Sequence, residues 1–92
     1  MMAANILVAG EWVESAHKVA IHAPFDHRVI GETFEADADL LERAISAAAD
    51  AVPTMQALSP RERAEILATV SDTIRVAAEP LAKLIAMEAG KP

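Results

Sequence analysis

The 92-residue sequence predicts one small α/β domain in which short strands come first and three helices follow. Over residues 1–36, short runs of alternating polar and apolar residues are separated by glycine and proline, a pattern typical of β-strands and turns. Over residues 37–92, apolar residues recur every three or four positions, which is the helical period. Hydrophobic residues reach 53% but aromatic residues only 3%, so much of the apolar content is alanine. Such faces suit helices packed on a larger neighbour better than a self-sufficient core.

The first strands are expected to form a hairpin over residues 5–13. Residues 6–8 and 12–13 are its apolar arms. Ala9 and Gly10 lie near the turn, where Gly10 supplies the positive φ that tight turns require. Trp12 is the only tryptophan, and we interpret it as a packing anchor.

Two further strands are expected at residues 18–22 and 29–34. The first alternates in polarity, with Val19 and Ile21 on one face, and Pro24 ends it. Residues 25–28 are expected to form a turn. Gly31 interrupts the second strand, where the backbone is expected to bulge or to pass close to a neighbour.

The first helix is expected to begin after Asp37, because an aspartate carboxylate is a good N-cap. Pro53 is expected to close or kink this helix, and residues 54–58 are expected to bridge to the next one. One side of the helix is apolar and carries Leu41, Ala44, Ile45, Ala48 and Val52.

The remaining two helices have explicit start and stop signals. Ser59 and Glu62 have the spacing of a capping box, and Pro60 falls at the first helical position, where a missing N–H costs nothing. Pro80 is expected to interrupt the helix, because its ring would clash with the carbonyl four residues back. Gly90 is expected to end the last helix in a left-handed cap. The apolar faces carry Leu67, Val70, Ile74, Ala77 and Ala78 in the second helix, and Leu81, Leu84 and Ile85 in the third.

Charge and composition argue against several classes of partner. A net charge of −6 repels phosphate backbones and anionic lipid, so we expect neither a nucleic-acid nor a membrane partner. No apolar run approaches the roughly 18 residues that cross a membrane, and we expect no secretory signal. The absence of cysteine is consistent with a cytoplasmic location. It also excludes disulfides, thiolate metal sites and a cysteine nucleophile within these residues.

We predict no catalytic, cofactor-binding or metal-binding residue in this chain. His17, His22 and His27 are spaced five apart, which puts neighbouring members on opposite faces of extended backbone, so we interpret them as solvated or turn histidines. The three glycines are too scattered to build a phosphate loop, and no serine has a glycine elbow around it. Two acidic pairs are interpreted as solvated: Asp37 with Asp39, and Glu32 with Glu35.

Glu88 is the acidic residue with the less usual position. It lies at the end of an apolar helix, where the helix macrodipole disfavours negative charge. A cation or basic group nearby is one interpretation, and simple exposure is the other.

Five short runs of the sequence occur in an order that is shared with a known family. They are Gly-Glu-Trp-Val at 10–13, a proline-bearing turn leading into Val-Ile-Gly at 29–31, Leu-Glu-Arg-Ala-Ile-Ser-Ala-Ala at 41–48, Leu-Ser-Pro-Arg-Glu-Arg-Ala-Glu-Ile-Leu at 58–67, and Leu-Ile-Ala-Met-Glu-Ala-Gly-Lys-Pro at 84–92. Their order and spacing cover nearly the whole chain. On these runs the chain resembles the N-terminal segment of the aldehyde dehydrogenase superfamily.

Two positions depart from the usual pattern of that family. Residues 23–28 are Ala-Pro-Phe-Asp-His-Arg, where members commonly carry Asn-Pro-x-Thr-Gly-Glu, and Met55 stands where tryptophan is frequent. A Pro-Phe/Tyr-Asp turn together with this methionine is most similar to the branches that act on lactaldehyde, phosphonoacetaldehyde or glyceraldehyde 3-phosphate.

The resemblance implies the N-terminal part of a Rossmann-type cofactor-binding domain, with the rest of that domain and the catalytic domain in a longer polypeptide. The parent would oxidise an aldehyde to a carboxylic acid with NAD or NADP through a cysteine thioester, as a homo-oligomer, dimer or tetramer. Residues 1–92 alone would be inactive and bind no cofactor, and their partner would be the remainder of the same polypeptide. Glu88 matches an acid that in some members lies beside a monovalent cation, with carbonyls of a strand ending near Ile21 and His22.

The alternative is a stand-alone acidic protein-interaction module made of a small sheet and three helices, which would bind a protein through an exposed apolar helix face. Cooperative unfolding of residues 1–92 as a soluble monomer would favour this alternative. An independent enzyme is disfavoured, since the sequence offers no nucleophile with its base, no metal set and no phosphate loop.

Overall fold

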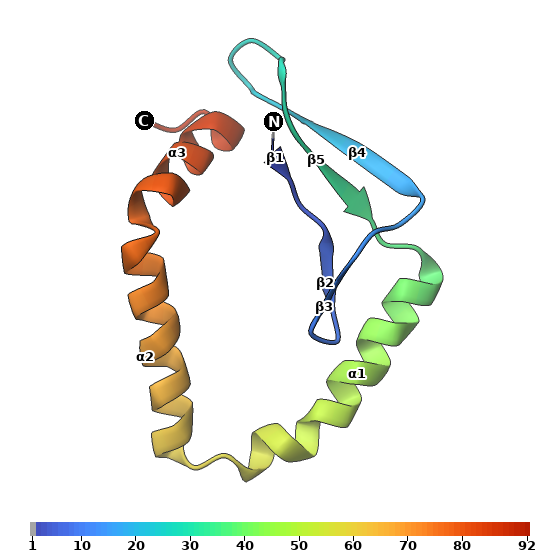
Figure 1. The fold of residues 1–92 in the computed structure, drawn as a ribbon, viewed down its shortest axis with the longest axis vertical. Helices are drawn as coiled ribbons and strands as arrows, with labels where there is room; N and C mark the ends of the chain where they lie inside the picture. The colour runs from blue at the N-terminus through green and yellow to red at the C-terminus, as the bar shows by residue number, and fades with distance from the viewer. Residues whose placement is uncertain (1) are drawn as a thin grey trace.

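The computed structural model describes residues 2–92, and these form short strands followed by three helices, as predicted. Figure 1 shows the strands gathered on one side and the helices continuing around an open ring that brings the last helix back towards the first strand. The elements in chain order are β1 Met2–Ala3, β2 Ile6–Val8, β3 Glu11–Val13, β4 His17–His22, β5 Val29–Glu35, α1 Ala38–Ala57, α2 Pro60–Val76 and α3 Ala78–Ala89.

The predicted hairpin is confirmed as the antiparallel pair β2–β3, in which Leu7 lies opposite Trp12. Ala9 and Gly10 connect the strands with φ values of 52° and 79°. Positive φ at both central residues is the pattern of a type I′ turn, whose twist matches the twist of the flanking strands. The expectation for Trp12 is wrong within the described chain: its side chain is 68% exposed, because no described element covers the face that it shares with Leu7.

The second sheet has the strand order β1-β5-β4, in which β1 pairs with β5 in parallel and β4 pairs with β5 antiparallel. The register shifts near the predicted irregularity: Ile21 pairs with Gly31 and His22 with Val29, so Ile30 is the extra residue. The turn after β4 is closed by Ala23 N–H donating to the carbonyl of Arg28 at 2.9 Å. β1 is the strand that the sequence pattern did not predict.

α1 begins as expected but ends later than expected. The carboxylate of Asp37 accepts a hydrogen bond from the N–H of Leu40 at 2.8 Å. The helix then continues through Pro53 to Ala57, so the prediction that residues 54–58 form a bridge is wrong for all but the last of them. A proline inside a helix removes one hydrogen bond and crowds one carbonyl, which bends the helix without ending it when helix-forming residues follow. Figure 1 shows α1 changing direction towards its end.

α2 and α3 follow their predicted signals, except that α2 ends at Val76, so that Ala77 and Ala78, which were expected on the second helix, are its cap and the first residue of α3. The capping box at the start of α2 is complete, with Ser59 and Glu62 each accepting from the other's backbone N–H at 3.1 Å. The helix breaks at Ala77, next to Val76, whose carbonyl is the group that the ring of Pro80 would meet in a continuous helix. Gly90 ends α3 in the left-handed region, with φ of 65°.

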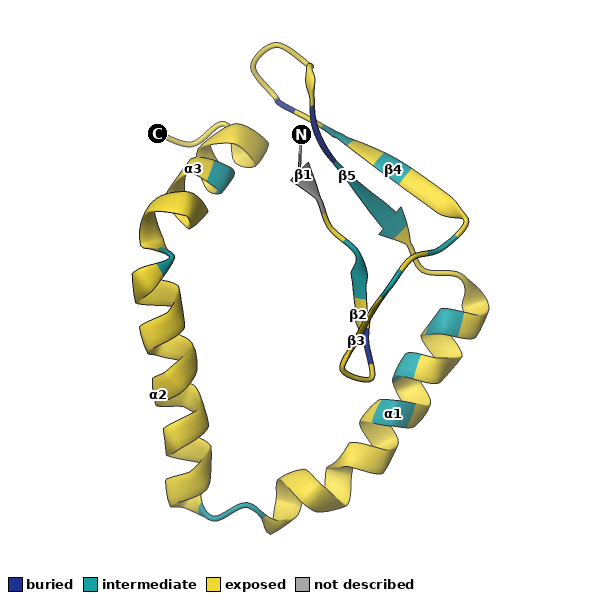
Figure 2. Cartoon of the chain, viewed as in Figure 1, coloured by how far each residue is buried: buried dark blue, intermediate teal, exposed yellow. Residues whose placement is uncertain are grey.

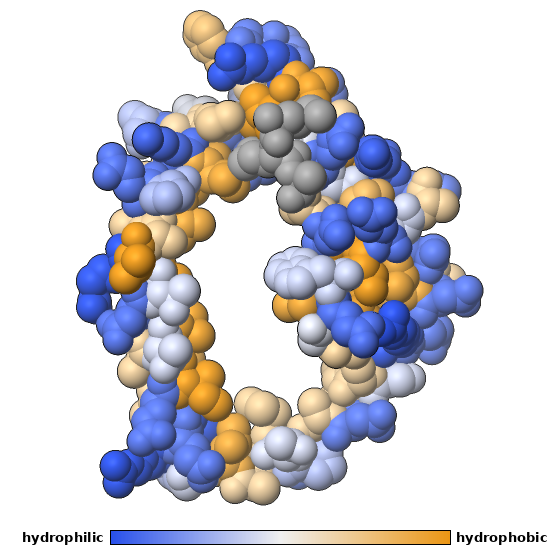
Figure 3. Space-filling view, in the orientation of Figure 1, coloured by the Kyte–Doolittle hydropathy of each residue, from blue (hydrophilic) through white to orange (hydrophobic). Residues whose placement is uncertain are grey.

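The described residues bury very little apolar surface. Three apolar side chains are buried, those of Val8, Ala23 and Ile30, and all three come from the strand region. The radius of gyration is 16.9 Å, against about 12 Å for a compact domain of this length. Figure 2 shows the helices almost entirely exposed, and Figure 3 shows an opening through the middle of the molecule.

Candidate functional site

The three histidines lie apart or act locally. His17 begins β4, whereas His22 ends it and makes a hydrogen bond of 2.9 Å between its Nδ1 and the carbonyl oxygen of His27. That contact keeps the turn between β4 and β5 in shape, since His27 has a φ of 60° and needs support from its neighbours. Within residues 2–92 no three histidine, aspartate or glutamate side chains come together in a way that could hold a metal ion.

The two acidic pairs make separate structural contacts. Asp37 caps α1, and the Glu32 carboxylate pairs with Lys18 of the neighbouring strand at 3.6 Å. Glu35 contributes its backbone carbonyl, which accepts a hydrogen bond from the hydroxyl of Ser15 at 2.5 Å. The carboxylates of Asp37 and Glu32 therefore have roles in helix and sheet formation.

The end of α3 meets the turn that follows β4. A Cβ atom at Gly90 would lie 3.7 Å from Cβ and Cγ of Pro24, so the helix cap and this turn are in van der Waals contact. Glu88 lies in the last turn of α3 and is exposed. The chain thus brings the helix that carries Glu88 to the end of the strand that the resemblance associates with it.

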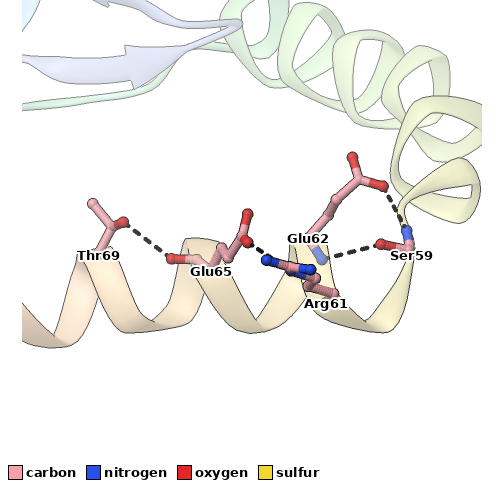
Figure 4. A network of polar contacts seen from close by, with 5 residues as sticks. All are labelled: Ser59, Arg61, Glu62, Glu65 and Thr69. Atoms are coloured by element: carbon pink, nitrogen blue, oxygen red, sulfur yellow. Dashed lines mark hydrogen bonds and ion pairs between the residues drawn. The ribbon is translucent and has the colours of Figure 1, made fainter.

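A network of polar contacts surrounds the start of α2 (Figure 4). The backbone N–H and then the side chain of Ser59 lower the pKa of Glu62 below its ordinary value of 4.5, because both favour the charged carboxylate. Arg61 pairs with Glu65 one turn later at 3.2 Å, and the hydroxyl of Thr69 donates to the carbonyl of Glu65. All of these contacts are local and exposed, so the network stabilises the helix start and offers no acid–base chemistry.

Two arginines connect elements in ways that the sequence did not indicate. Arg43 of α1 forms an ion pair of 2.6 Å with Glu11 of the hairpin. Arg63 of α2 donates at 2.6 Å to the carbonyl of Met55 in α1. Both contacts join residues that lie on different elements, and a single sequence carries no signal for such pairings.

The largest unexplained feature is the set of apolar side chains that the helices leave exposed. Met55, Ile66 and Leu67, with Arg63, line a hollow of about 230 Å³ at the corner between α1 and α2. Apolar residues of this kind continue along all three helices. The arrangement can bind an apolar surface. None of the three helices is both long enough and apolar enough to cross a bilayer.

Comparison with known proteins gives consistent matches. The model of the aldehyde dehydrogenase family matches residues 12–92. The chain is 31% identical to aldehyde dehydrogenase family 7 member A1 of Pisum sativum, over 91% of this chain and 16% of the relative. It is 33% identical to betaine aldehyde dehydrogenase of Rhizobium etli, over 97% of this chain and 19% of the relative. It is 34% identical to the succinate-semialdehyde dehydrogenase (NADP+) GabD of Escherichia coli, over 94% of this chain and 18% of the relative. The chain therefore spans less than a fifth of the length of these relatives.

Proposed function

Because the chain belongs to the aldehyde dehydrogenase family and matches its N-terminal segment, we propose that it is part of a longer enzyme that oxidises an aldehyde to a carboxylic acid. The observation that carries this proposal is the family match over residues 12–92, which includes β3, β4, β5 and all three helices. The electron acceptor is NAD or NADP, and one of the similar relatives is named for NADP+.

The chemistry of such an enzyme needs groups that these residues do not supply. A cysteine thiolate adds to the aldehyde, loss of hydride leaves a thioester, and water then releases the acid and the thiol. The nicotinamide, when bound, accepts the hydride. This chain has no cysteine, so the nucleophile belongs to another part of the parent. Residues 1–92 are accordingly inactive alone and bind no cofactor by themselves.

The role of residues 1–92 is structural within that enzyme. They supply the opening strands and first helices around a Rossmann-type cofactor-binding domain, whose remainder lies in the same polypeptide. The open ring and the three buried apolar side chains support this role, because a segment with so small a core depends on further contacts. The same proposal includes a cytoplasmic location, in agreement with the cysteine-free composition, and a homo-oligomer, a dimer or a tetramer, which the family resemblance implies.

The substrate class is an aldehyde, and two sets of observations point to different members of that class. The turn at Pro24, Phe25 and Asp26 together with Met55 resembles enzymes for lactaldehyde, phosphonoacetaldehyde or glyceraldehyde 3-phosphate. The similar relatives carry names with other aldehydes, among them betaine aldehyde and succinate semialdehyde. A panel that contains all five aldehydes separates these possibilities.

The test uses the parent protein with its natural reading frame. We expect purified parent protein to reduce NAD or NADP in the presence of at least one aldehyde of the panel, and to release the corresponding acid. When each cysteine of the parent is replaced in turn, one replacement should abolish the activity and the others should not. A natural stop codon after Pro92, or a parent that reduces neither nucleotide with any aldehyde, would overturn the proposal.

A further inference from the structure

A continuous apolar surface runs along the helices of the ring. We call it the apolar band and define it by the exposed apolar residues that share one face in each helix: Leu41, Ile45, Val52 and Met55 of α1, Ile66, Leu67, Val70 and Ile74 of α2, and Leu81 and Ile85 of α3. Each of these side chains is between 41% and 69% exposed. Monomeric proteins rarely leave so many neighbouring large apolar side chains uncovered.

The band occupies one face of α2, and the ion pairs of that helix occupy the other. Ile66, Val70 and Ile74 follow one another at intervals of four residues, which keeps them on one side of the helix. The ion pairs of α2 join Arg61 with Glu65 and Arg75 with Asp72. Helical periodicity puts both pairs on the side away from the band. This division indicates that the charged side meets solvent and that the band meets protein.

On α2 the band faces the opening of the ring (Figure 3). Figure 3 shows hydrophobic atoms along the inner edge of α2, beside the opening, and hydrophilic atoms along its outer edge. At the corner, the contact of Arg63 with the Met55 carbonyl holds α1 and α2 together, so that Met55, Ile66 and Leu67 line one hollow. The contact between Gly90 and Pro24 closes the ring at its other end. One body placed in the opening would therefore touch several helices at once.

We propose that the apolar band is the docking surface for a segment of the parent polypeptide that follows Pro92 and fills the opening of the ring with apolar side chains. This inference rests on the proposed function, because it requires the longer chain. Three observations favour this occupant. The relatives are more than five times as long as the matched segment, so ample chain is available. The members of the band are large aliphatic side chains and one methionine, which suit a permanent core better than a transient interface, and Arg63, the charged residue beside them, is already bonded to the Met55 carbonyl.

The third observation is the shape of the molecule, which argues against a second copy as the occupant. The ring is only 16 Å thick along its shortest axis, against 48 Å along its longest. Two such rings could stack through their flat sides, but stacking leaves the inner edges uncovered. An occupant that enters the opening reaches the band directly.

Val70 and Val76 give a matched pair for the test, because they have the same side chain on the same helix. Val70 is in the band and 49% exposed, whereas Val76 lies on the other side and is 88% exposed. The two exposed fractions differ by less than twofold, so they alone would make the labelling rates of the two valines differ by less than twofold. Hydroxyl-radical labelling of the full-length parent should modify Val70 many-fold more slowly than Val76. Val70→Asp should lower the thermal midpoint by several degrees or prevent soluble expression, and Val76→Asp should do neither.

A photo-crosslinking residue at position 70 in the full-length parent identifies the occupant. The protein is prepared in light and heavy isotopic forms, mixed in equal amounts, unfolded and refolded together, and then irradiated. Crosslinks from position 70 to residues after Pro92 that contain a single isotopic form lie within one chain, and they support the inference. Mixed-isotope crosslinks would show a second copy in the opening and overturn it, as would equal labelling of the two valines.

If the parent ends at Pro92 or oxidises no aldehyde, it is the proposed function that fails. If the parent is active while Val70 stays reactive, only the docking inference fails.

Discussion

At the scale of single residues, the features that the sequence predicts well are those whose partners lie within a few positions. Ser59 and Glu62 are three residues apart, and both hydrogen bonds of their capping box are present at 3.1 Å. Gly90 is the left-handed cap that its place after an apolar helix indicated. Replacing an N-cap serine by alanine typically costs about 1 kcal/mol, so these local signals have enough energy to set where a helix begins.

The lowered pKa of Glu62 makes the start of α2 sensitive to acid. Because the folded-state pKa lies below the unfolded value of 4.5, the charged carboxylate stabilises the helix above that pH, and the contribution is lost as the pH falls through the folded value. In a peptide of residues 57–77, helix content measured by circular dichroism should therefore fall as the pH is lowered below about 4.5, and Glu62→Gln should reduce this fall. Glu65→Gln is the control for the titration of the neighbouring acid. Equal acid sensitivity in the native and Glu62→Gln peptides would contradict this account.

At the scale of elements, three prolines in the helical region have three different outcomes. Pro60 starts α2, Pro53 lies inside α1, and Pro80 follows the break at Ala77. A proline at the first position lacks an N–H that would have no partner anyway. Further along, the ring crowds the carbonyl four residues back, and the helix either bends, as in α1, or divides, as between α2 and α3. The sequence correctly predicted that the helix divides before Pro80. For Pro53 it left two outcomes open, that the helix closes or that it kinks.

Pro60 and Pro80 allow a controlled test of the break between α2 and α3. In a peptide of residues 59–90, Pro80→Ala should raise the helix content, because the new N–H can donate to the carbonyl of Val76 and a continuous helix becomes possible. Proline is less favourable than alanine by about 3 kcal/mol in a helix interior, whereas at the first position the exchange is nearly neutral. Pro60→Ala should therefore leave the helix content unchanged. No gain from Pro80→Ala would mean that Ala77 breaks the helix for a reason other than this proline.

Contacts between elements mark the limit of what the sequence could predict. The apolar faces of the helices were visible as a repeat of three and four residues, but nothing in that repeat indicated that they line one opening. β1 pairs with β5 across nearly thirty residues of chain, and a two-residue strand has no pattern of its own. Trp12 was interpreted as a packing anchor because large aromatic residues are usually covered, yet it is 68% exposed and no described element covers it. Local chemistry set the elements, and long-range packing decided how they are arranged.

At the scale of the whole molecule, we expect residues 1–92 not to fold cooperatively by themselves, because the described residues bury only three apolar side chains. The exposed apolar band and the extended ring predict that the isolated segment keeps helical far-ultraviolet circular dichroism, binds a hydrophobic dye, and shows either aggregation or a broad thermal transition. Trp12 is the only tryptophan, so its fluorescence in the isolated segment should resemble that of tryptophan in water. The full-length parent is the control and should unfold cooperatively, without dye binding before the transition. A soluble monomer of residues 1–92 with a sharp transition would favour the stand-alone acidic protein-interaction module, because such a segment would have to cover its own band.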